Sequence, residues 1–160
     1  MLFLVVLLLG ARGLRDVVTL ATTFTVAHSA TLALASLGAV KAPAAVVEPL
    51  IALSIAYVAA DNVLGGGRTR HRIPIVLGFG LLHGLGFAGS IEFAYGVDLV
   101  SALLAFNVGI ELGQAAIVLV LFPALLTVCR WSRAPVAHAA AGSAAAAVGL
   151  FWFSERVFGG

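Results

Sequence analysis

Three ionisable side chains lie near the middle of three apolar segments of the chain. His28 occurs in TTFTVAHSATL, His83 in GFGLLHGLGFAGSIEF and Glu111 in FNVGIELGQ. Ionisable groups are costly in hydrocarbon, so those that persist in a membrane helix tend to face the bundle interior and mark a site or pathway. Imidazole and carboxylate ligands suit borderline divalent ions such as nickel, cobalt, zinc and iron. The pattern predicts a metal site at one depth, formed by these three residues.

Shorter polar side chains share the helical faces of these residues, because positions three, four or seven apart lie on one side of a helix. They are Thr22, Thr25 and Ser29 beside His28, and Asn107 and Gln114 beside Glu111. We expect them to orient the ligands or line the pathway. Gly80, Gly84 and Gly86 surround His83, and we expect them to allow a close helix contact that brings the imidazole to a neighbour's carboxylate.

Further polar residues lie toward the segment ends. Glu48 and Glu92 lie toward one end and complete the predicted set of metal-contacting residues, as carboxylates that attract the cation at an outer mouth. Asp61 and Asn62 end their segment on the opposite side, where we expect them to guide the cation's exit.

Each of these residues also has a simpler structural explanation. A membrane histidine is often only an interhelical hydrogen-bond donor, and polar amides such as Asn107 and Gln114 often only hold helices together. Glu48 and Glu92 fit interfacial residues, and Asp61 with Asn62 fits a helix cap. The same imidazole and carboxyl groups also fit a proton relay, alone or coupled to metal movement.

The composition assigns the chain to the membrane. Of its 160 residues, 62% are hydrophobic and 10% are charged, and the mean hydropathy is +1.14, whereas a soluble domain is about one quarter charged. Apolar segments fall at 1–10, 17–40, 44–64, 73–95, 99–128 and 136–153. We predict an all-α polytopic transmembrane bundle of six helices, the first one short, in one domain over residues 1–160. The single cysteine, Cys129, has no partner for an intrachain disulfide and is assigned to packing.

Basic residues between the segments predict the orientation, because Lys and Arg accumulate on the cytoplasmic side. Seven arginines follow the first, third and fifth segments, and Lys41 and Arg156 stand opposite them. The seven are Arg12, Arg15, Arg68, Arg70, Arg72, Arg130 and Arg133. The N- and C-termini are therefore expected outside the cytoplasmic membrane of a bacterium.

Four motifs in the same order resemble the HupE/UreJ family of small membrane proteins associated with nickel hydrogenases and ureases. They are TTFTVAHSATLALASLG, VEPLIALSIAYVAADN, FGLLHGLGFAGSI and FNVGIELGQ, within about residues 1–125. The resemblance implies a permease for nickel, sometimes cobalt, with about six helices or more and no ATPase. Its matching positions are His28, Glu48, Asp61, Asn62, His83, Asn107, Glu111 and Gln114.

The chain departs from the family in its first helix. Family members resemble one another in a motif of the form His, a few residues, Gly-x-Asp-His, followed by an apolar run, and this sequence starts at the apolar run LFLVVLLL. Either the start was placed too far downstream, or the chain is a reduced member that binds metal poorly. The short first segment favours the first explanation.

The function predicted from these observations is secondary transport of a divalent transition metal, nickel before cobalt, with uptake as the expected direction. No tightly bound cofactor and no nucleic-acid partner are expected. The sequence is compatible with a homo-oligomer. An enzyme is not expected, because the chain has no HExxH motif and no Ser or Cys at a recognisable spacing from His. The alternatives are a membrane scaffold or assembly factor for a nickel metalloenzyme and a proton-linked carrier of another small solute.

Overall fold

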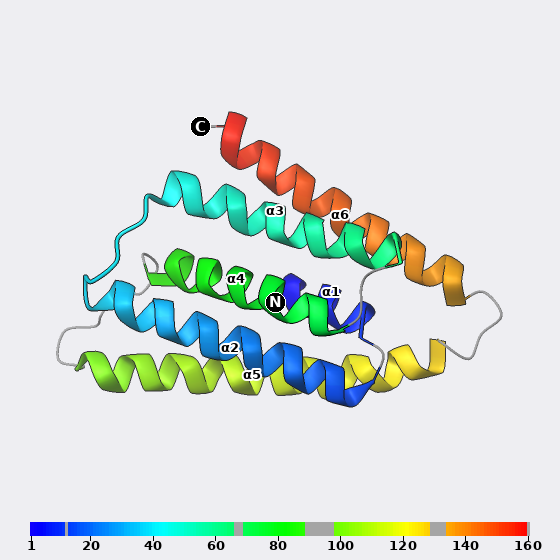
Figure 1. Cartoon of the computed structure of the whole chain (residues 1–160), viewed down its shortest axis with the longest axis horizontal. Coiled ribbons are helices and arrows are strands. Elements are labelled where there is room, and N and C mark those ends of the chain that lie inside the picture. Colours follow the sequence, from blue (N-terminus) through cyan, green and yellow to red (C-terminus); the bar gives the residue numbers. More distant parts are fainter. Residues whose placement is uncertain (12, 66–68, 89–97, 129–133, 160) are drawn as a thin grey trace.

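The computed structural model describes residues 1–11, 13–65, 69–88, 98–128 and 134–159, and this part of the chain is built from helices without strands (Figure 1). The six helices are α1 Leu2–Leu9, α2 Leu14–Ser36, α3 Ala44–Val63, α4 Thr69–Ala88, α5 Leu99–Val128 and α6 Ala134–Phe158. Each helix overlaps one of the six segments predicted from the sequence, with bounds that differ by a few residues. The all-α fold class and the short first helix are confirmed.

The helices run alternately in opposite directions along the bundle (Figure 1). Helices α1, α3 and α5 end, and α2, α4 and α6 begin, at the same end of the bundle. The arginine-rich stretches of the sequence adjoin these helix ends. The other end holds the C-terminus of the chain and the start of α3, so the helix directions agree with the alternation of basic and non-basic connections.

The protein is a membrane protein. Four of its described helices, α2, α3, α5 and α6, are long and apolar enough to cross a bilayer. Helix α1 has 8 residues, which cover about 12 Å of a hydrocarbon core of about 30 Å. It extends from the middle of the bundle to one end (Figure 1). Helix α4 packs against both α2 and α3.

Helix α1 lies in the interior and supplies part of the core. Phe3, Val6 and Leu7 are buried in a cluster with residues of α2, α3, α4 and α6, including Leu20 and Ile55. On the other side of α1, Leu4 and Leu8 pack with Val17 and with apolar residues of α5. Because α1 contacts helices on both sides, it holds α5 to the rest of the bundle along that half of its length.

Two glycines of α4 allow its backbone to approach α2 closely. A Cβ atom at Gly80 would lie 2.8 Å from the carbonyl oxygen of Phe24, and one at Gly84 would overlap the side chain of Thr31 and the carbonyl oxygen of His28. The hydroxyl of Thr31 donates a hydrogen bond of 2.8 Å to the carbonyl of Leu81 on α4. The expected close contact at these glycines is confirmed, and it joins the helix of His83 to the helix of His28. The expectation that it brings His83 to a carboxylate is wrong for the described residues, because the ring nitrogen of His83 pairs with the Phe79 carbonyl and the ring packs on Phe3 and Phe24.

We predict that Gly84→Ala destabilises the protein by about 1–3 kcal/mol, because the added methyl group has no space against the α2 backbone. The matched control is Gly78→Ala on the same helix, where a Cβ atom meets nothing within 4 Å. The free energy of unfolding in a mixed-micelle denaturant titration measures both. Equal stability of the two variants would contradict the described α2–α4 contact.

Candidate functional site

A cavity of about 400 Å³ lies beside the N-terminal end of α1 and is lined by residues of all six helices. Its polar or ionisable side chains are His28, Glu48, His83, Gln114 and Arg156. The rest of the lining is mostly apolar and includes Phe3, Phe24, Ile51, Ile55, Phe87, Ile110 and Trp152. The cavity therefore brings together three of the residues expected to contact a metal: His28, His83 and Glu48.

The ring orientation of His83 leaves one nitrogen available to a ligand. Its Nδ1 lies 2.7 Å from the carbonyl oxygen of Phe79, one turn earlier on α4. Because a carbonyl oxygen only accepts hydrogen bonds, Nδ1 carries the proton and Nε2 keeps its lone pair. This is the arrangement in which a backbone carbonyl orients a metal-binding imidazole.

His28 is 1% exposed, and neither of its ring nitrogens has a hydrogen-bond partner among the described residues. Its ring stacks between Phe24 and Phe106, with ring centroids 5.8 and 6.4 Å away. A buried polar group without a partner costs free energy. The imidazole of His28 is therefore held in the cavity wall by packing, with unused capacity to bind a ligand.

Phenylalanine rings separate the two imidazoles from the surrounding bundle. The ring of Phe24 lies 5.8 Å from His28 and 5.2 Å from His83, between centroids, so one aromatic ring contacts both. Phe3 of α1 lies 4.9 Å from His83, and Phe87 lies 5.4 Å from His28. Rings at these distances limit the imidazole rotations and the access of water. An ion that reached this part of the cavity would find imidazole nitrogen as its main donor.

Glu48 lies where the same cavity reaches the start of α3 and the end of α6. Its carboxylate is 3.5 Å from Nε of Arg156, and the two side chains are 55% and 38% exposed. A pair this exposed contributes little to stability. Its charges are free to interact with ions at the cavity mouth, which is the position expected for Glu48 from the sequence.

The predicted polar stripes of α2 and α5 meet and pair with each other. The hydroxyl of Thr25 donates a 3.0 Å hydrogen bond to Oε1 of the buried Gln114 side chain, and the hydroxyl of Ser29 donates one to Oδ1 of Asn107. Gln114 also lines the cavity. These pairs join α5 to α2 beside the two histidines.

One expected carboxylate, Glu111, lies away from the cavity, and a second, Glu92, is not described. Glu111 is exposed and does not line it, because Glu111 lies about 40° and 60° around α5 from Asn107 and Gln114, the residues turned toward α2. Glu92 lies outside the described residues. Among the residues described, no three His, Cys, Asp or Glu side chains gather into a metal-holding group, so His28, His83 and Glu111 do not form a common three-ligand set there.

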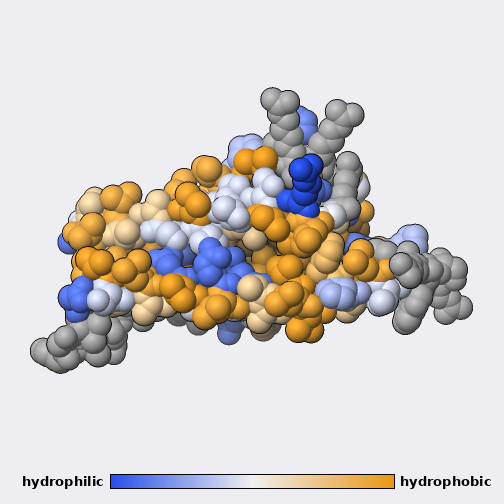
Figure 2. Space-filling view, turned by 90° about the horizontal axis from the view of Figure 1, so that it is seen from below, coloured by the Kyte–Doolittle hydropathy of each residue, from blue (hydrophilic) through white to orange (hydrophobic). Residues whose placement is uncertain are grey.

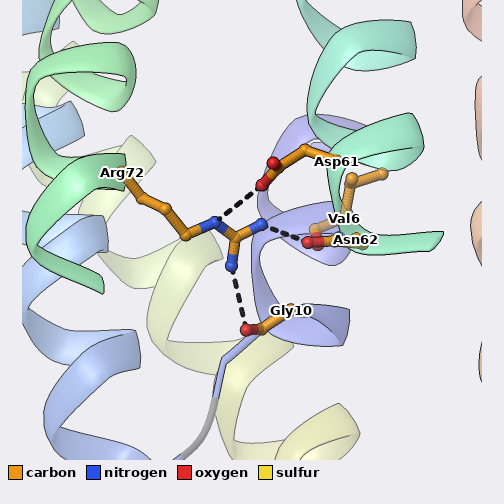
Figure 3. A network of polar contacts seen from close by, with 5 residues as sticks. All are labelled: Val6, Gly10, Asp61, Asn62 and Arg72. Carbon is orange, nitrogen blue, oxygen red and sulfur yellow. Dashed lines mark hydrogen bonds and ion pairs between the residues drawn. The ribbon is translucent and has the colours of Figure 1, made fainter. Parts of the chain in front are cut away.

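Asp61 and Asn62 bind Arg72 at the other end of the bundle (Figure 3). The guanidinium of Arg72 lies 3.3 Å from the Asp61 carboxylate, donates to Oδ1 of Asn62 and donates a 2.9 Å bond to the carbonyl of Gly10. Asn62 in turn donates a 2.6 Å bond to the carbonyl of Val6. The network connects the end of α3, the first turn of α4 and the carbonyls that end α1.

The sequence predicts Arg72 in a basic cytoplasmic loop, and this is wrong, because Arg72 is 6% exposed and lies within α4. The signal in the sequence is the short connection between Asp61 and Arg72, which brings a carboxylate at one helix end to a guanidinium at the start of the next helix.

A protein-family model described as HupE / UreJ protein matches residues 1–156. The match is longer than the resemblance seen in the four motifs and extends through most of α6. No curated protein and no solved structure matches the chain.

We predict that Arg72→Lys lowers the free energy of unfolding by about 1–3 kcal/mol. Three different nitrogens of the planar guanidinium serve the three acceptors, and a single ammonium nitrogen cannot reach all of them at hydrogen-bond distance. The matched control is Arg156→Lys, whose ion pair is exposed and whose replacement is expected to change stability by less than about 0.5 kcal/mol. The measurement is denaturant unfolding in mixed micelles. A larger effect at Arg156 than at Arg72 would overturn the assignment of Arg72 as a structural clamp.

Proposed function

The chain belongs to the HupE/UreJ family, and we propose on this basis that it is a secondary transporter of a divalent transition metal ion, with nickel as the first candidate and cobalt as the second. The observation that carries the proposal is the cavity shared by His28, His83 and Glu48. Imidazole nitrogen binds first-row divalent ions such as nickel, and a carboxylate at the mouth raises their local concentration.

In the proposed mechanism Glu48 attracts the hydrated cation from outside the cell. The cation then exchanges part of its water for the imidazole nitrogens of His28 and His83. Two neutral donors hold a divalent ion less tightly than a full protein ligand set would, which suits a cargo that must leave again. Gln114 lies beside this site and is positioned by Thr25.

Protonation of the histidines competes with the metal, because imidazole must be neutral to act as a ligand. Protons supplied as the ion moves on would therefore weaken its binding and favour release. We propose that the ion leaves toward the end that carries Asp61 and Asn62, where the Asp61 carboxylate is paired with Arg72. Passage past this end requires that the network opens, so the described arrangement corresponds to a closed exit.

The orientation that fits this route has the mouth at Glu48 on the outer side of a bacterial inner membrane, and the arginine-rich end in the cytoplasm. Both chain termini would then face outward. The predicted role of Glu111 as a metal-contacting residue is not used in this mechanism, because its side chain does not line the cavity. Glu92 is not used either, because it lies outside the described residues.

We predict that His28→Ala and His83→Ala each lower the initial rate of nickel uptake by at least about tenfold at low external nickel, because each removes one of two nitrogen donors. Uptake is measured as cell-associated nickel in bacteria that lack their own nickel transporters and express the chain. His71→Ala and His138→Ala are matched controls, since neither residue lines the cavity.

Membrane levels of every variant are measured alongside uptake. Equal nickel uptake by the cavity variants and the control variants, at equal membrane levels, would contradict the proposed transport site. If the cavity variants lower metalloenzyme yield but leave nickel uptake unchanged, the protein is an assembly factor instead.

Glu48→Gln is expected to raise the nickel concentration for half-maximal uptake by about three- to sevenfold, with little change in the maximal rate, because an exposed carboxylate contributes mainly long-range attraction. Arg156→Gln is expected to lower that concentration, because it removes a cation from the mouth. Asp16→Asn is the control, since Asp16 lies in the first turn of α2, at the opposite end of the bundle from Glu48. A change in maximal rate alone at Glu48→Gln would contradict the assigned position at the mouth.

A further inference from the structure

The carboxylate of Glu111 lies on the outside of the bundle in the middle of a membrane helix. It is near the centre of the 30-residue helix α5, its side chain is exposed, and no hydrogen bond or ion pair joins it to any described residue. A charged or unpaired carboxyl group facing acyl chains at this depth costs several kcal/mol. The described part of the monomer therefore leaves this carboxyl group without a polar partner inside the bilayer.

Helix α5 is also the membrane helix that the bundle covers least. In its most apolar window 6% of residues are buried, compared with 33% in α2 and 44% in α3. Its contacts with other helices are made by one side, which carries Asn107, Gln114 and the residues that pack on α1. The remaining sides are free for contact with lipid or with another protein.

Four exposed residues of α5 follow a spacing typical of helix–helix seams. Leu104, Val108, Glu111 and Ala115 are separated by four, three and four positions, and all four are exposed. A repeat of alternating three and four residues lies along one stripe of a helix and packs against the same stripe of a second helix. A single polar residue in such a seam determines the register of the pair.

The face formed by α2 and α5 carries polar side chains near its middle. Figure 2 shows a hydrophilic patch near the middle of the face formed by α2 and α5, with hydrophobic surface toward both ends. Ser29 and Asn107 are half-buried and paired with each other at this seam, and the Thr22 hydroxyl on α2 is exposed. The Asn107 amide also donates a 2.8 Å hydrogen bond to the carbonyl of Leu103, so these two side chains satisfy each other and the α5 backbone, whereas Glu111 has no such partner among the described residues.

We propose that a second copy of the chain packs on this face, α5 against α5 along the stripe of Leu104, Val108, Glu111 and Ala115. A two-fold axis along the bundle direction brings the two Glu111 carboxyl groups together, as expected for a homodimer. Two carboxyl groups at hydrogen-bond distance share a proton, because both cannot be ionised at that separation. A second copy fits this stripe because the stripe is self-complementary. Each apolar residue meets an apolar stripe, and each Glu111 carboxyl group meets the carboxyl group of the partner.

The first test is disulfide cross-linking in native membranes with single cysteines, in a background where Cys129→Ser removes the natural one. Val108→Cys, on the stripe, is expected to give a covalent dimer on mild oxidation. Val120→Cys is the matched control, because it is an exposed valine on the same helix and lies off the stripe. The proposal is overturned if Val120→Cys forms a covalent dimer and Val108→Cys does not. It is also overturned if both variants remain monomeric.

The second test compares Glu111→Gln with Glu111→Leu by measuring the dimer dissociation constant from energy transfer between labelled copies in lipid vesicles. The amide of Gln still donates and accepts, so its constant is expected to stay within about threefold of the wild type. Leu cannot hydrogen-bond, and its constant is expected to rise by roughly three- to thirtyfold. Equal constants for Leu and wild type would show that the carboxyl group faces lipid. Neither test involves metal, so both are independent of the proposed transport function.

Discussion

The close approach of α4 to α2 is the contact on which the candidate site depends. Gly80 and Gly84 have no side chains between the two backbones, and a methyl group at either position would collide with α2. This approach holds His83 and His28 in the wall of one cavity, with the ring of Phe24 against both. A wider separation of the helices would place the imidazoles in different environments and leave no shared site.

The ionisable side chains of the bundle lie in three kinds of environment, and each environment has a different consequence. Arg72 is buried and fully engaged by Asp61, Asn62 and a backbone carbonyl, so its charge serves the fold. Glu48 and Arg156 form an exposed ion pair at the cavity mouth, which contributes little to stability. The two cavity histidines are surrounded by aromatic rings, and the nitrogens of His28 have no partner among the described residues, which favours binding of a cargo.

The sequence predicted the helices well, because hydrophobic segments and glycine-rich or charged breaks are local signals. It also predicted that the glycines around His83 mark a close contact, since glycine inside a membrane helix usually has a packing role. The direction in which a side chain points around its helix axis was harder to predict from the sequence. Glu111 shares a stripe with Asn107 and Gln114 in the sequence, but its position about 40° away from Asn107 is enough to turn it outward. Likewise Arg72 was assigned to a loop because burial of an arginine depends on partners from other helices.

The most direct test of the metal site is X-ray absorption spectroscopy at the nickel edge on the purified protein loaded with one equivalent of nickel. The account predicts scattering from two imidazole rings, with the remaining donors oxygen, and the loss of one ring in each of His28→Ala and His83→Ala. A spectrum with oxygen donors alone, or one that the two substitutions leave unchanged, would contradict the claim that these histidines bind the transported ion.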